Sequence, residues 1–123
     1  GGLMYLLDSI DECPVCKILK GESVMTDRLQ RFGYVNMEIR DNIILGKKGD
    51  NLYGQEFHRS IVNTKSEPLY NITKPKSNRK WQCGYGYKNV FAAYPHINFL
   101  GNMKAFNYLL DNIEKNKEKD HVY

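Results

Sequence analysis

The residue best placed to do chemistry in this sequence is His96, which follows an apolar run and precedes a helical pattern. Residues 90–94 are β-branched, aromatic or small, and Pro95 fits only where the strand needs no further backbone donor. If the chain stays extended beyond Pro95, His96 and Asn98 share a face, because side chains two apart in a strand are co-facial. The pattern predicts a base beside an amide that orients it. Without a second reactive residue, an ordinary half-buried histidine explains the same pattern.

A Glu-x-His pair lies within a second strand candidate, residues 53–62. Alternation puts Glu56, His58 and Ser60 on one face and leaves Gln55 and Phe57 on the other. Such a face is unusual in a β pattern, and its simplest interpretation is an exposed surface with salt bridges.

The three cysteines do not form a convincing metal site. Cys13 and Cys16 make one Cys-x-x-Cys, which is half of a zinc site, but Cys83 and the histidines at 58 and 96 are poorly spaced to complete it. We expect no metal, and cysteines that pack or lie at the surface. An odd number of cysteines without a signal peptide fits a reduced, cytoplasmic protein.

The elements that must position these residues read as an α/β mixture. A polar residue between a strand and a helix is where open α/β sheets place their chemistry. The first half of the chain predicts an apolar helix over residues 1–10, two strands within 24–39 joined around Phe32-Gly33, a short strand at 42–46 and a turn at 47–50. The second half predicts the strand 53–62, an edge strand at 69–73, a turn or bulge within 81–87 and the strand 90–94. A helix then starts from Gly101-Asn102, and its apolar stripe is Met103, Phe106, Leu109, Leu110 and Ile113. We expect one domain over residues 1–113 and a frayed, charged tail over 114–123.

Charge and hydropathy exclude some function classes. The net charge of +4 is mild and mostly dispersed. The one basic run, residues 74–80, has no interleaved aromatics and contains a proline, so we expect an exposed loop without a nucleic-acid role. No apolar stretch approaches the roughly 20 residues that span a bilayer, which predicts a soluble protein without a membrane partner.

Several segments, in order, resemble the CobB/CobQ-like class I glutamine amidotransferase domains, the C-terminal domains of corrin-ring amidating enzymes such as the cobyrinic acid a,c-diamide synthases. The resemblance covers almost the whole chain and implies the back half of a flavodoxin-like α/β domain, with a mixed sheet and flanking helices. The matching residues are Gly1-Gly2-Leu3-Met4-Tyr5-Leu6, Met25 with Arg28-Leu29 and Gly33-Tyr34, Gly54-Gln55-Glu56-Phe57-His58, and Asn89 through Ala92 with Tyr94, His96 and Phe99.

The resemblance implies roles for individual residues. In this family the nucleophilic cysteine directly precedes the Gly-Gly pair, so Gly1 and Gly2 would form the nucleophile elbow, with the Gly1 N–H stabilising the oxyanion. His96 would be the catalytic base. Asn98 stands where the class has a glutamate and this branch a second histidine; its carbonyl would orient the ring without supplying charge. Glu56 and His58 would line the active-site wall.

Two function classes follow. The first is part of a glutaminase domain that supplies ammonia for ATP-dependent amidation of the a and c carboxylates of a corrinoid. ATP and Mg²⁺ would bind a separate synthetase domain, and these residues alone would be inactive and would self-associate through uncovered strands. The second is a non-catalytic α/β binding or interaction module related to amidotransferases.

Overall fold

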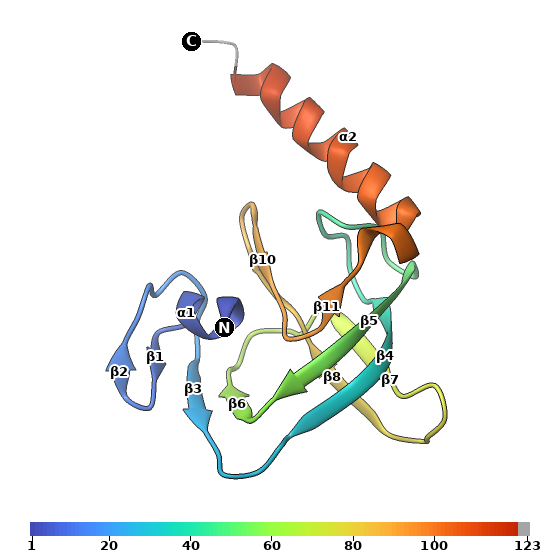
Figure 1. Ribbon diagram of the computed structural model, residues 1–123. Coiled ribbons are helices and arrows are strands. Elements are labelled where there is room, and N and C mark those ends of the chain that lie inside the picture. The colour runs from blue at the N-terminus through green and yellow to red at the C-terminus, as the bar shows by residue number, and fades with distance from the viewer. Residues whose placement is uncertain (121–123) are drawn as a thin grey trace.

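The structure, a computed structural model, describes the backbone of residues 1–120 as a mixed α/β arrangement of short strands with one long C-terminal helix (Figure 1). The expected fold class, mixed sheet with flanking helices, is confirmed. In chain order the elements are α1 (Gly2–Leu6), β1 (Ser9–Ile10), β2 (Cys13–Pro14), β3 (Glu22–Met25), β4 (Arg31–Ile39), β5 (Asn51–His58), β6 (Ser60–Asn63), β7 (Tyr70–Thr73), β8 (Lys80–Cys83), β9 (Tyr85–Tyr87), β10 (Val90–Ala92), β11 (His96–Ile97), the 3₁₀ turn η1 (Phe99–Gly101) and α2 (Met103–Asp120).

A five-stranded antiparallel sheet, in the order β11-β5-β4-β7-β8, carries the candidate residues. Its inner face forms much of the core, including Val35, Met37, Ile39, Leu52 and Ile72. Its outer face exposes four large aromatic side chains on β4 and β5, here called the outer aromatic face: Phe32, Tyr34, Tyr53 and Phe57. The two sides of β5 therefore meet different environments.

Two smaller sheets complete the strands. The order β2-β1-β3-β6 contains one parallel pair, β1 with β3, and β9 forms a hairpin with β10. Helix α1 ends at Leu6, and the backbone of Leu7 is extended. Tyr5, Leu6 and Leu7 use their carbonyls to accept N–H groups of residues 16–19. Because those carbonyls are taken, the expected helix over 1–10 is wrong beyond Leu6.

Five strand predictions need correction. The strand expected over 53–62 is divided at Arg59 into β5 and β6, which lie in different sheets, and the strand expected over 90–94 ends at Ala92, so His96 lies in a separate strand, β11. The two strands expected within 24–39 exist, but they meet at residues 26–30, because the backbone N–H groups of Thr26 and Gln30 donate to the carbonyls of Arg59 and His58. The strand expected at 69–73 is not an edge strand, since β8 pairs along its outer side. The short strand expected at 42–46 is reduced to a single bridge between Ile43 and Gly46.

Helix α2 begins at Met103, as expected, and projects away from the sheets in Figure 1. The helix runs to Asp120, so the described part of the expected tail is helical, and residues 121–123 lie outside the described residues. Leu110 and Ile113, two members of the expected apolar stripe, are half exposed. Within residues 1–120, no helix combines the length and apolar character needed to cross a membrane.

Candidate active site

A buried polar cluster occupies the inner face of β5, where Glu56 and His58 lie together. Glu56 is only 2% exposed. One of its carboxylate oxygens, Oε2, lies 2.8 Å from His58 Nε2, and the other accepts the Trp81 indole N–H at 3.0 Å. The expected grouping of Glu56 with His58 on one face is confirmed, but the interpretation as an exposed salt-bridging surface is wrong, because Trp81 of β8 covers the pair.

Both ring nitrogens of His58 face acceptors. Nε2 meets the Glu56 carboxylate, and Nδ1 lies 3.0 Å from the carbonyl oxygen of Ser60. The donor and acceptor roles of the two ring nitrogens depend on the tautomer, and in either tautomer the two contacts fix the orientation of the His58 ring.

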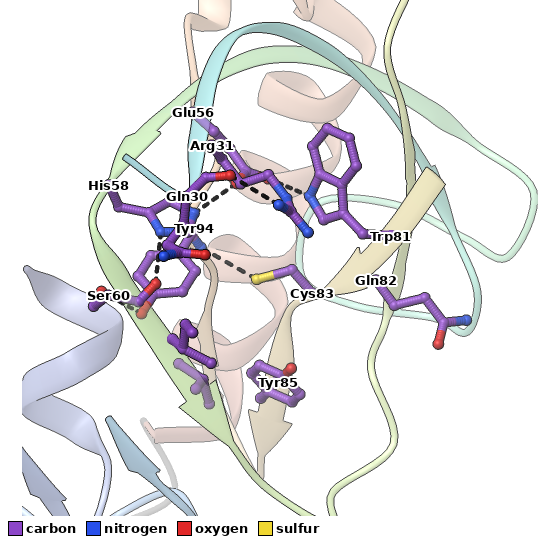
Figure 2. Close-up of a pocket in the computed structure, with 12 residues that line it drawn as sticks. Gln30, Arg31, Glu56, His58, Ser60, Trp81, Gln82, Cys83, Tyr85 and Tyr94 are labelled. Atoms are coloured by element: carbon purple, nitrogen blue, oxygen red, sulfur yellow. Dashed lines mark hydrogen bonds and ion pairs between the residues drawn. The ribbon is translucent and has the colours of Figure 1, made fainter. Parts of the chain in front are cut away.

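Tyr94 packs directly on this pair, as Figure 2 shows. Its ring stacks on the His58 imidazole with centroids 3.7 Å apart and an interplanar angle of 12°. The Tyr94 hydroxyl lies 2.5 Å from Ser60 Oγ, and its backbone N–H donates to Cys83 Sγ at 3.4 Å. Burial raises the pKa of the Tyr94 hydroxyl, which therefore stays protonated at neutral pH.

A cavity of about 150 Å³ opens beside these groups. The Arg31 guanidinium lies 4.6 Å from the centroid of the Trp81 ring at its rim. Burial raises the pKa of the Cys83 thiol to about 11, which makes it a poor nucleophile at neutral pH. The lining residues are Gln30, Arg31, Glu56, His58, Ser60, Ile61, Val62, Trp81, Gln82, Cys83, Tyr85 and Tyr94 (Figure 2).

His96 lies on the opposite side of the sheet from this cluster. It is the exposed first residue of β11 and pairs with Gln55, an outward-facing residue of β5. Paired residues of an antiparallel ladder share a face, so His96 points outward while Glu56 and His58 point inward. Gly54 permits the close approach of β11: a Cβ at this position would lie 2.5 Å from the His96 carbonyl oxygen.

Asn98 has another use for its side chain. Its Oδ1 accepts the Leu100 N–H at 2.9 Å and so caps η1. The structure does not bring Asn98 to the His96 ring through a hydrogen bond between the two side chains, and the orienting role expected for it stays a prediction.

Comparison with known proteins gives this geometry a family context. A family model described as the CobB/CobQ-like glutamine amidotransferase domain matches residues 1–104. Cobyrinate a,c-diamide synthase of Clostridium acetobutylicum is 40% identical over 113 residues, which is 89% of this chain and 26% of that protein. The enzyme of the same name from Clostridium tetani is 40% identical over 90% of the chain, and that from Listeria monocytogenes is 35% identical over 94%.

The chain belongs to the CobB/CobQ-like glutamine amidotransferase domain family. It spans about a quarter of the length of these curated relatives. The family resemblance drawn from the sequence is thereby confirmed.

The glycines expected at the nucleophile elbow of this amidotransferase domain lie at the start of α1. Gly1 is the N-cap of that helix and accepts the Tyr5 N–H at 3.2 Å. The helix is linked to the buried cluster through Met4, whose sulfur accepts the Ser60 hydroxyl at 3.3 Å. Within the described residues, this is the hydrogen bond that ties α1 to the cluster around Glu56.

Cys13 and Cys16 are exposed beyond α1. Among the side chains that the structure describes, those of residues 1–117, no group of three or more His, Cys, Asp and Glu is arranged to hold a metal ion.

Sequence reasoning missed the role of Trp81 and Ser60 in this domain. Both residues lie in strands whose positions the sequence pattern predicts only approximately. Trp81 reaches Glu56 because of the order and register of the strands between β5 and β8 in the sheet. The available signal was a Glu-x-His pair on the same face of a strand as Leu52, which requires buried partners if that face packs on the core.

Proposed function

We propose that these residues are part of the glutaminase domain of an ATP-dependent, glutamine-hydrolysing amidoligase that converts the a and c carboxylates of cobyrinate to amides. The observation that carries the proposal is the family match over residues 1–104, together with three relatives named cobyrinate a,c-diamide synthase. The substrates would be glutamine and a corrinoid. ATP and Mg²⁺ would bind in a part of the enzyme outside these residues.

By resemblance to the family, His96 is the base of this glutaminase. His96 takes the proton of the nucleophilic thiol, the thiolate attacks the side-chain amide carbon of glutamine, and His96 passes that proton to the departing ammonia. Water, deprotonated by the same imidazole, then releases glutamate from the thioester, and the thiol regains its proton. Exposure of His96 on the outer face leaves room for a substrate and a thiol to approach it. Backbone N–H groups at the start of α1, including that of Gly1, would stabilise the oxyanion.

The thiol is proposed to come from outside these residues. Cys83 is buried with a pKa raised to about 11, and its Sγ accepts the Tyr94 N–H on the inner side of the sheet. Cys13 and Cys16 follow α1 in and beside β2, away from the elbow glycines in sequence. The isolated 123-residue chain should therefore release no glutamate. The cytoplasm, where thiols stay reduced, is the compartment that such a reaction needs.

Glutamate release by the full-length enzyme tests the assignment. His96→Ala should remove several orders of magnitude of the rate, because a nucleophile and its base act as a unit. Asn98→Ala should cost much less, since its side chain caps η1. Near-normal glutaminase activity in His96→Ala would place the base elsewhere, and a full-length enzyme that cannot hydrolyse glutamine at all would favour the non-catalytic binding module.

A further inference from the structure

The strand that carries His96 is too short to hold its own register. β11 contributes two residues to the ladder, His96 opposite Gln55 and Ile97 opposite Gly54, at the edge of the sheet. A slip by one residue would turn every side chain of β11 to the opposite face. His96 would then point inward. Something outside β11 must fix the register.

The side chain of Asn102 fixes the backbone that follows β11. Its Oδ1 accepts the Tyr53 N–H at 2.8 Å, and its Nδ2 donates to the carbonyl oxygens of Tyr53 at 2.9 Å and Asn98 at 2.8 Å. In a continued ladder Asn98 would be the residue opposite Tyr53. The side chain of Asn102 takes that place, because it pairs with both backbone groups of Tyr53 as an opposing strand residue would.

Capping of α2 does not explain this side chain. The Asn102 backbone carbonyl accepts the Phe106 N–H at 3.0 Å, but the side chain makes its three hydrogen bonds to residues 53 and 98. At 8% exposure, the Asn102 amide has exchanged water for these bonds. Loss of the amide would leave the part-buried backbone groups of Tyr53 and Asn98 without these partners.

The side chain of Tyr94 fixes the backbone that precedes β11. Two residues before His96, its ring is stacked on His58 of β5 and its hydroxyl is bonded to Ser60 of β6. His58 is itself fixed at both ring nitrogens by Glu56 and the Ser60 carbonyl. Pro95, with its fixed φ, joins Tyr94 to His96. Both ends of the His96 segment are thus attached to the same strand, β5, or to its continuation.

We propose that Asn102 and Tyr94 are positioning residues that set the register of β11 and so hold the His96 imidazole on the outer face of the sheet. The proposal rests on the function proposed above for His96. A displacement of about 1 Å in a catalytic group costs roughly 100-fold in rate, so loss of either attachment should lower kcat rather than weaken glutamine binding.

The test compares Asn102→Ala with Asn107→Ala in the full-length enzyme, since Asn107 is an exposed asparagine of α2, the helix that follows Asn102. Asn102→Ala should lower kcat for glutamine hydrolysis by about 100-fold with KM nearly unchanged, whereas Asn107→Ala should leave both unchanged. Amide hydrogen exchange gives a readout independent of activity: the Tyr53 N–H should lose protection in Asn102→Ala while the β4 and β7 amides keep theirs.

A second pair, Tyr94→Phe and Tyr87→Phe, covers the case in which Asn102→Ala does not fold. Phenylalanine keeps the stack on His58 and removes the bond to Ser60, so Tyr94→Phe should lower kcat several-fold; Tyr87 is exposed and its variant should be silent. Wild-type kcat in Asn102→Ala with an unprotected Tyr53 amide, or wild-type kcat in Tyr94→Phe, would overturn the proposal. Full activity in His96→Ala would instead overturn the proposed function.

Discussion

Replacement of Glu56 should separate the shape of this side chain from its hydrogen bonds. Glu56→Leu keeps the approximate size of the side chain but makes it apolar, which removes the acceptor of the Trp81 N–H and the partner of His58. The change leaves the Trp81 N–H and the His58 ring nitrogen without a partner, and each buried polar group left unsatisfied costs about 1–3 kcal/mol, so we expect a loss of about 2–6 kcal/mol. Glu56→Gln keeps one oxygen for Trp81 and places an N–H toward His58 Nε2, which can accept it when Nδ1 carries the ring proton. We expect a loss of about 1 kcal/mol for that variant.

Urea unfolding of the chain, followed by the fluorescence of its single tryptophan, measures both losses. The fluorescence of Trp81 is sensitive to this site, because its indole N–H donates a hydrogen bond to Glu56. Glu38→Gln is the matched control: Glu38 is exposed on the outer side of β4, and its change should lie within about 0.5 kcal/mol of zero. The reasoning is refuted if Glu56→Leu is as stable as the wild type, or if Glu56→Gln is as destabilised as Glu56→Leu.

Three further outcomes follow from the same structure. Because burial raises the pKa of Cys83 to about 11, iodoacetamide at about pH 8 should modify Cys13 and Cys16 and spare Cys83, which peptide mass spectrometry detects. The same raised pKa means that the Cys83 contribution to stability is complete below the ordinary thiol pKa of 9.0 and is lost as the pH rises toward about 11; equal stability across that window would contradict it. The outer aromatic face should make the chain self-associate, so light scattering should show a concentration-dependent mass above 14.3 kDa, reduced by Phe32→Lys; a constant mass at that value would be the opposite result.

Local periodicity predicted the faces of β5 correctly. Alternation alone separates Glu56 and His58 from Gln55 and Phe57, and the structure keeps that division. It could not predict burial, because the cover over Glu56 comes from Trp81, which reaches it through the β5-β4-β7-β8 order of the sheet. Pairing order is a long-range property, and a strand pattern contains no information about which strand lies three places away in the sheet.

For the candidate site, too, the sequence predicted features that depend on nearby residues and missed those that depend on distant ones. The start of α2 was found from the sequence, since it depends on residues close in the chain. The strand expected over 90–94 was to deliver His96, but it ends at Ala92 and pairs with β9, and His96 lies in β11 of another sheet. The expected partnership of His96 with Asn98 was drawn from co-facial spacing, but the Asn98 side chain caps η1. A free N–H two residues ahead competes for an asparagine oxygen at short range. Asn102, which reaches across to Tyr53, gave no comparable local signal.

Amidation of cobyrinate with two nitrogen sources tests the central claim most directly. If these residues form a glutaminase whose base is His96, the full-length His96→Ala enzyme should lose amidation that depends on glutamine by about a thousandfold or more, yet keep wild-type amidation when ammonium is supplied in its place. Equal loss with both nitrogen sources would show that His96 acts in amide formation or folding, and undiminished amidation with glutamine would contradict its role as the base.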